Sequence, residues 1–124
     1  MKKIEPVRLQ RKRTKGFHLE SPNGLEIVYV GRPTKYGNPF VVGKPIPKVY
    51  LHMSFSWADT MKYGGNLKIR YNDEAVRLFE KYALPNKSDI EELRGKNLCC
   101  WCPIDQPCHA DVLLELANGE VKDA

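Results

Sequence analysis

The four cysteines of this 124-residue chain lie within ten residues of one another, and this clustering restricts the fold more than any other feature. They are Cys99, Cys100, Cys102 and Cys108. A secreted scaffold held by disulfides spreads its cysteines to tie separate segments together. Here a hydrophobic core must hold the chain, and the length and the 42% hydrophobic content suffice for one. We therefore expect reduced thiols and a cytoplasmic protein.

Three segments have the pattern of β-strands. Val7 and Leu9 alternate with polar residues, residues 26–30 are β-branched and aromatic, and residues 97–101 form a short apolar run. No apolar run approaches the roughly 20 residues that a membrane span needs, so we expect no membrane partner.

Three later segments have apolar residues at helical spacing. The spacing is weak over 49–63, clear over 73–84 behind an expected Asn72 cap, and clearest over 108–117. A short helix is expected from Ser88, which forms a capping box with Glu91. Strand–loop–helix units at both ends predict an α/β fold. We expect one compact domain over 1–124, with a small mixed sheet flanked by helices and with frayed ends at 1–5 and 119–124.

A long Gly/Pro loop follows the second strand. Residues 31–48 contain four prolines, so they cannot form a helix, and their apolar content is too high for a mobile linker. We expect an ordered loop at a strand end, where α/β sheets place ligands. Arg32, Lys35 and Asn38 are its candidate anion-binding residues, and a rigid surface loop with solvated charges is the alternative.

The net charge of +5 belongs to one segment of the chain. Residues 1–16 hold seven basic residues and one acid, which leaves 13 basic and 14 acidic residues, a net of −1, in the remainder. Arg11, Arg13 and Lys15 are therefore candidate anion-binding residues, with a solvated tail as the alternative. Thr14–Gly16 is expected to be a turn.

The Cys/His cluster supports three interpretations. Cys100, Cys102, Cys108 and His109 could hold a zinc ion, although the spacing differs from paired C-x2-C motifs and the last two residues would diverge within one helix. Cys108 could be a nucleophile activated by the helix N-terminus, with His109 as base and Asp111 as orienting group. Some of these cysteines could instead be core residues, above all Cys99.

The segments RLQRKRTKGF, VYVGRPTKYGNPF and LRGKNLCCWCPIDQPCHADVLLELAN resemble a family of small bacterial and phage proteins, DUF4326. The resemblance covers nearly the whole chain and is weakest over 44–71. Phe17 stands where many members are expected to have tryptophan. The resemblance implies no specific activity, and it carries over these residues: Arg11, Arg13, Lys15, Gly16, Gly31, Arg32, Gly37, Asn38, Pro39, Cys100, Trp101, Cys102, Cys108, His109 and Asp111.

Our leading hypothesis is a small cytoplasmic enzyme, in a bacterium or a phage-infected host cell, that acts on a nucleotide, a modified base or nucleic acid. A Cys/His centre would carry the chemistry and the Arg/Lys residues would bind the anionic part of the substrate. The alternative is a non-catalytic module that binds nucleic acid or protein and contains a structural zinc or a packed cysteine cluster. An inhibitor of a host protein is a third interpretation.

Overall fold

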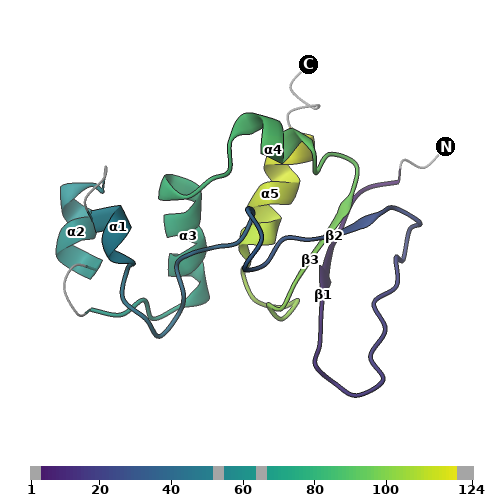
Figure 1. Ribbon diagram of the computed structural model, residues 1–124, viewed down its shortest axis with the longest axis horizontal. Coiled ribbons are helices and arrows are strands. Elements are labelled where there is room, and N and C mark those ends of the chain that lie inside the picture. The colour runs from purple at the N-terminus through teal and green to yellow at the C-terminus, as the bar shows by residue number, and fades with distance from the viewer. Residues whose placement is uncertain (1–3, 52–54, 64–66, 120–124) are drawn as a thin grey trace. The chain divides into compact units, whose positions relative to one another are not determined.

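The computed structural model describes residues 4–51, 55–63 and 67–119 (Figure 1). The chain divides into two compact units, one made of Met1–Gly37 with Pro85–Ala124 and the other of Asn38–Leu84. The single-domain organisation stays a prediction. The ends expected to be frayed lie largely outside the described residues.

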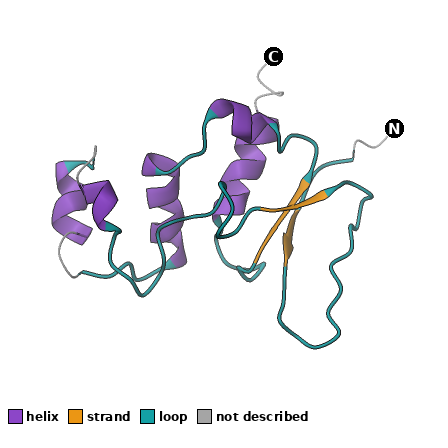
Figure 2. Ribbon diagram, viewed as in Figure 1, coloured by secondary structure: helices purple, strands orange, loops and turns teal. Residues whose placement is uncertain are grey.

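The first unit contains a three-stranded sheet, drawn in orange in Figure 2. Its strands are β1 (Arg8–Gln10), β2 (Ile27–Tyr29) and β3 (Asn97–Cys100), in the order β1-β3-β2. Both pairings are parallel, so the α/β class is confirmed and the expectation of mixed strand directions is wrong. The reason is that each connection returns the chain to the same end of the sheet, as parallel strands require.

The central strand β3 is buried along its whole length. Its first residue, Asn97, is fully buried and polar, and its side chain supplies the bonds that the neighbouring loops need. The Asn97 Oδ1 accepts the Val7 backbone N–H at 3.0 Å, and its Nδ2 donates to Asn23 at 2.8 Å and to Ser21 at 3.2 Å. Buried polar groups must be hydrogen-bonded. The Asn97 amide therefore holds both the residue that precedes β1 and the loop that precedes β2 in place.

Two helices accompany the sheet. Helix α5 (His109–Asn118) packs against β3, β1 and α4 (Lys87–Glu91), and it buries Ala110, Leu113 and Ala117. These residues recur at helical spacing, so the predicted helix is confirmed. The expected Ser88 cap is wrong, because Asn86 caps α4 by accepting the Asp89 backbone N–H at 2.8 Å.

The second unit is helical. It contains α1 (Lys48–Leu51), α2 (Trp57–Tyr63) and α3 (Asn72–Tyr82), and the break between the first two falls partly outside the described residues. The expected Asn72 cap is wrong: α3 begins at Asn72, and Tyr71 occupies the cap position without a side-chain bond. The apolar core of this unit includes Phe40, Ile46, Ile69, Leu78 and Phe79.

The Gly/Pro loop is irregular, as predicted, and its large apolar residues Tyr36, Phe40 and Ile46 are buried, whereas Val42 is exposed. Tyr36 lies in the first unit, and Phe40 and Ile46 lie in the second. None of the helices in the described residues is both long and apolar enough to span a bilayer.

Candidate metal centre and ligand-binding edge

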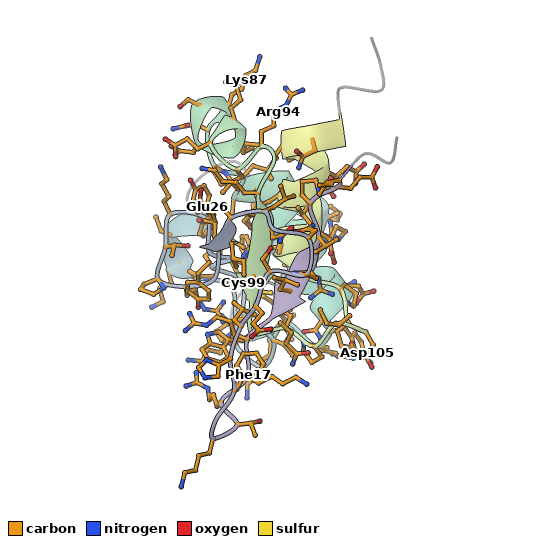
Figure 3. The ribbon with its side chains drawn as sticks, turned by 90° about the vertical axis from the view of Figure 1, so that its right-hand side faces the viewer. Phe17, Glu26, Lys87, Arg94, Cys99 and Asp105 are labelled. Carbon is orange, nitrogen blue, oxygen red and sulfur yellow. The ribbon has the colours of Figure 1, made fainter. Side chains whose placement is uncertain are left out.

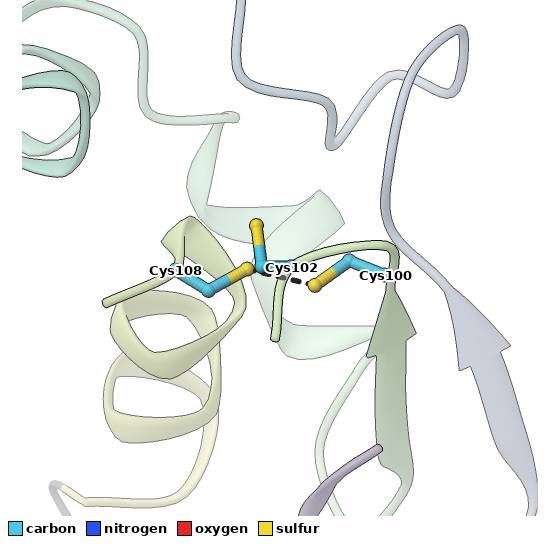
Figure 4. A group of neighbouring side chains, drawn as sticks. All are labelled: Cys100, Cys102 and Cys108. Carbon is cyan, nitrogen blue, oxygen red and sulfur yellow. Dashed lines mark hydrogen bonds between the residues drawn. The ribbon is translucent and has the colours of Figure 1, made fainter. Parts of the chain in front are cut away.

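Three cysteine sulfurs converge at the carboxyl end of the sheet (Figure 4). Cys100 ends β3, Cys102 follows in the loop, and Cys108 immediately precedes α5. The three Sγ atoms lie within 4.8 Å of one another, and those of Cys100 and Cys108 are 2.8 Å apart. Cys100 and Cys108 are buried and Cys102 is half-buried. The expected convergence of these thiols is confirmed, and the group could hold a metal ion.

His109 is buried beside this group. Its Nε2 lies 2.7 Å from the Val30 carbonyl oxygen, which can only accept, so Nε2 carries the proton. The Nδ1 atom then presents a lone pair, and it lies 3.6 Å from the Cys108 sulfur. Burial lowers the pKa of His109, so the neutral ring is favoured.

The local backbone removes one geometric objection to a shared ion. Adjacent residues inside a helix would point about 100° apart. Cys108, however, is extended, with φ −146° and ψ 147°, and the helix begins at His109. The sulfur and the imidazole can therefore approach one point from different backbone geometries.

The thiols share one hydrogen-bonded cluster. Bonds from the Cys102 and Cys108 thiols lower the pKa of Cys100, while the same contacts raise the pKa of Cys102 and of Cys108. Hydrogen bonds from neighbouring thiols therefore stabilise one thiolate in the cluster and oppose the formation of a second. Cys108 itself is buried, and a buried thiol is poorly accessible to a substrate as a nucleophile.

Arg8 holds the loop that joins the cysteines. From β1, its Nη atoms donate to the carbonyl oxygens of residues 102, 103, 104 and 106 at 2.8 to 3.4 Å. Its Nε pairs with the Asp111 carboxylate at 2.9 Å. Burial alone would lower the pKa of Arg8, but Asp111 and the cysteine sulfurs raise it, so the guanidinium stays charged.

Sequence reasoning missed Arg8. The alternation of apolar and polar residues along β1 predicts that Arg8 faces solvent, whereas only 8% of its side chain is exposed. The one available signal was a basic residue on a predicted strand in a mostly basic segment, and that signal does not identify its partner. Asp111 does not orient a base here. Its carboxylate accepts the Cys108 backbone N–H at 3.2 Å and pairs with Arg8.

A second group of side chains lies at the same end of the sheet. We call Arg11, Arg13, Tyr29 and Trp101 the arginine–aromatic stack. The Arg11 guanidinium lies 4.9 Å from the Tyr29 ring centre and 5.0 Å from that of Trp101, and the Arg13 guanidinium lies 4.3 Å from Trp101. These are cation–π distances. Trp101 and Tyr29 were not among the predicted site residues, although the resemblance included Trp101.

The two groups lie on opposite faces of the sheet. Leu9, Cys99 and Tyr29 are in register, so their side chains share a face, and the stack continues this face one step beyond the strands. Cys100 lies on the other face, which α5 covers. Figure 3 shows Phe17 and Asp105 at one end of the sheet and Glu26 at the other, with Cys99 between them.

The remaining predicted anion-binding residues are Lys15, Arg32, Lys35 and Asn38. Lys15 lies in the predicted turn, where the Phe17 backbone N–H donates to Thr14 at 3.0 Å and Gly16 has φ +82°. The Arg32 carbonyl accepts the Tyr29 hydroxyl at 2.7 Å, and this bond links the Gly/Pro loop to the stack.

Two loop residues are engaged within the protein. The Lys35 ammonium pairs with Asp89 and Glu92, each at 2.9 Å, and bonds to Glu92 and Asp89 raise its pKa. Asn38 is buried and belongs to the second unit, where it donates to the Ala75 carbonyl at 3.0 Å and accepts the Phe40 backbone N–H at 2.9 Å. These contacts give both residues structural roles.

Comparison with known proteins places the chain in a family. The model of a domain of unknown function, DUF4326, matches residues 9–119. The chain belongs to this family. The match includes the three cysteines, His109 and all members of the stack. No curated protein matches the chain, and no solved structure does.

Proposed function

We propose that this DUF4326 protein holds one zinc ion through Cys100, Cys102, Cys108 and His109, and that the metal shapes a site for a nucleotide or nucleic acid. The observation that carries the proposal is the convergence of three sulfurs within 4.8 Å. In a tetrahedral zinc site with Zn–S distances near ~2.3 Å, neighbouring sulfurs lie about 3.8 Å apart. The Cys100–Cys108 sulfur distance of 2.8 Å and the upper limit of 4.8 Å for the group lie on either side of this value, so small side-chain movements suffice to seat one ion.

His109 supports a closed site with four protein ligands. Histidines that bind metals usually donate their other ring N–H to a carbonyl or carboxylate, which fixes the tautomer. The Nε2 bond to Val30 is such a contact, and it leaves Nδ1 on the side of Cys108. A closed set of four protein ligands is typical of structural zinc.

Charge balance supports the same set. Three thiolates exceed the charge of Zn²⁺ by one negative unit, and Arg8 supplies a buried positive charge nearby. The best-supported function is therefore a binding module with a structural metal, which was the alternative to the leading hypothesis.

An enzyme is the second candidate, favoured by the half-buried position of Cys102. If His109 keeps only its bond to Val30, the three cysteines alone would hold the ion, and a metal with an open position would supply activation of water for hydrolysis. Cobalt substitution separates the candidates, because its visible spectrum differs between a ligand set with imidazole and one with water. Product formation from a nucleotide by the metal-loaded protein, and none after chelation, would establish the enzyme.

Native mass spectrometry with and without a chelator tests the metal directly. We expect a mass excess of one zinc that Cys100→Ser, Cys102→Ser and Cys108→Ser each abolish or strongly reduce. Cys99→Ser is the matched control, because Cys99 is equally buried but faces away from the group. A chain purified from zinc-supplemented cells with no metal, or an equal loss in the Cys99 variant, contradicts the proposal.

A further inference from the structure

We propose that the arginine–aromatic stack binds single-stranded nucleic acid: unpaired bases extend the stack at Trp101 and Arg13, and phosphates pair with the two guanidinium groups. This inference deepens the proposed function by naming the ligand class and the surface. It also separates that surface from the metal, because the two lie on opposite faces of the sheet.

The guanidinium charges of the stack have no ion-pair partner among the residues that the structure describes. In the described part of the chain, no carboxylate pairs with Arg11 or Arg13, and their contacts are with aromatic rings. Lys12 and Lys15, on the same segment, are exposed. Residues 9–17 contain four basic residues and no acid. This excess suits a polyanion whose charges repeat along a backbone.

The rings and guanidinium groups are held in place before any ligand binds. The Arg11 backbone N–H donates to the Cys100 carbonyl at 2.8 Å, which ties the basic segment to the end of β3. The Tyr29 hydroxyl bonds to Arg32. Because these parts are already ordered, binding costs less conformational entropy.

Exposed aromatic and guanidinium planes favour single strands over duplex. Bases stack on aromatic rings and on guanidinium planes only where their own faces are uncovered, and a duplex covers them. Trp101 is 36% exposed and Arg13 is exposed, so both offer a surface to an incoming base. A surface that bound phosphate alone would gain nothing from the aromatic rings.

The metal would act on this site through Trp101. Cys100 and Cys102 flank Trp101 in the sequence and point to the opposite face. An ion that joins both sulfurs would fix the backbone on each side of the ring. This part of the inference rests on the proposed zinc site, whereas the binding surface itself does not.

Fluorescence anisotropy of a labelled, mixed-sequence DNA strand of about 12 nucleotides tests the surface, because such sites span roughly 4–16 nucleotides. The full chain is used as purified, with its zinc content measured in parallel. We expect Trp101→Ala to weaken binding by at least about fivefold, the lower bound for losing one stacked base. The affinity of Trp101→Phe should lie between those of the wild type and Trp101→Ala. Trp57→Ala is the control, because Trp57 is 79% exposed and lies outside the stack.

Salt dependence tests the guanidinium groups. Replacing Arg11 and Arg13 together by alanine should reduce the slope of log affinity against log salt by about 1.4, since each lost phosphate contact on a single strand contributes about 0.7. The matched control is the double replacement of Lys44 and Lys48 by alanine, which removes the same charge from exposed positions elsewhere.

Any of three results would overturn the proposed binding surface. The folded Trp101→Ala variant could bind the strand with wild-type affinity, or the protein could bind the duplex of the same sequence equally well. The arginine and lysine double variants could also lose affinity equally. Displacement of the strand by an equal concentration of polyglutamate would assign the surface to an acidic protein instead. Trp101→Ala keeps every proposed metal ligand, so zinc content measured on this variant shows separately whether the metal proposal holds.

Discussion

At the scale of single residues, Arg8 organises the candidate metal centre without being a ligand. Four carbonyl oxygens of the cysteine loop and one carboxylate converge on its guanidinium. The planar group offers five donors in a fixed geometry, which a lysine ammonium does not. The loop therefore has its shape before any ion arrives.

We expect Arg8→Ala to lower the free energy of unfolding by about 2–3 kcal/mol, because hydrogen bonds to a charged group contribute roughly 1.5–3 kcal/mol. Arg8→Lys should recover little of this loss although it keeps the charge. Urea unfolding followed by circular dichroism measures both. Wild-type stability in the lysine variant would mean that charge alone holds the loop.

At the scale of elements, the segments with local patterns were predictable and their partners were not. The pattern of β3 and the helical spacing of α5 lie within ten residues each, so the sequence alone indicated both. The convergence of the thiols also followed from spacing. The parallel pairing, the Arg8 contacts and the role of Tyr29 depend on residues that are distant in the chain, and a single sequence carries no signal for such pairs.

Helices α2 and α3 are joined by a buried carboxylate. Asp59 of α2 accepts hydrogen bonds from Arg77 at 2.9 Å, Lys81 at 3.0 Å and Tyr82 at 2.6 Å, all on α3. Burial alone would raise the pKa of Asp59, but the bonds from these three residues lower it well below its usual value. The ionised form therefore stabilises the pairing.

The pH dependence of stability follows from this shift. An unfolded aspartate titrates near pH ~3.9, so the contribution of Asp59 is complete above about pH 5 and is lost as the pH falls towards the depressed folded value. Asp59→Asn should cost about 2 kcal/mol at pH 7 and flatten the acid limb of stability. Thermal unfolding between about pH 2 and 7 measures this. An unchanged acid limb in the variant would place the titrating group elsewhere.

At the scale of the whole molecule, each compact unit carries one tryptophan, Trp101 in the first and Trp57 in the second. A metal that binds only the native state stabilises whatever unfolds together with its site. A single cooperative domain would report one transition through both rings. The two side chains can therefore test the predicted single-domain organisation.

We expect the Trp57→Phe and Trp101→Phe variants to show the same unfolding midpoint, and both midpoints to fall together when zinc is chelated. Intrinsic fluorescence during urea unfolding follows the remaining ring in each variant. A midpoint that falls with chelation only where Trp101 remains would show two separately unfolding units and would contradict the prediction.

The strand order has a consequence for synthesis of the chain. Among the described residues, β1 and β2 each pair with β3, and β3 follows both of them in the sequence. While residues before 97 leave the ribosome, β1 and β2 have no partner in the sheet, and pairing over such sequence separations is intrinsically slow. The proposed metal ligands, all between residues 100 and 109, emerge directly behind β3. Sheet closure and metal capture thus become possible at nearly the same moment, once residues 97–109 have been synthesised.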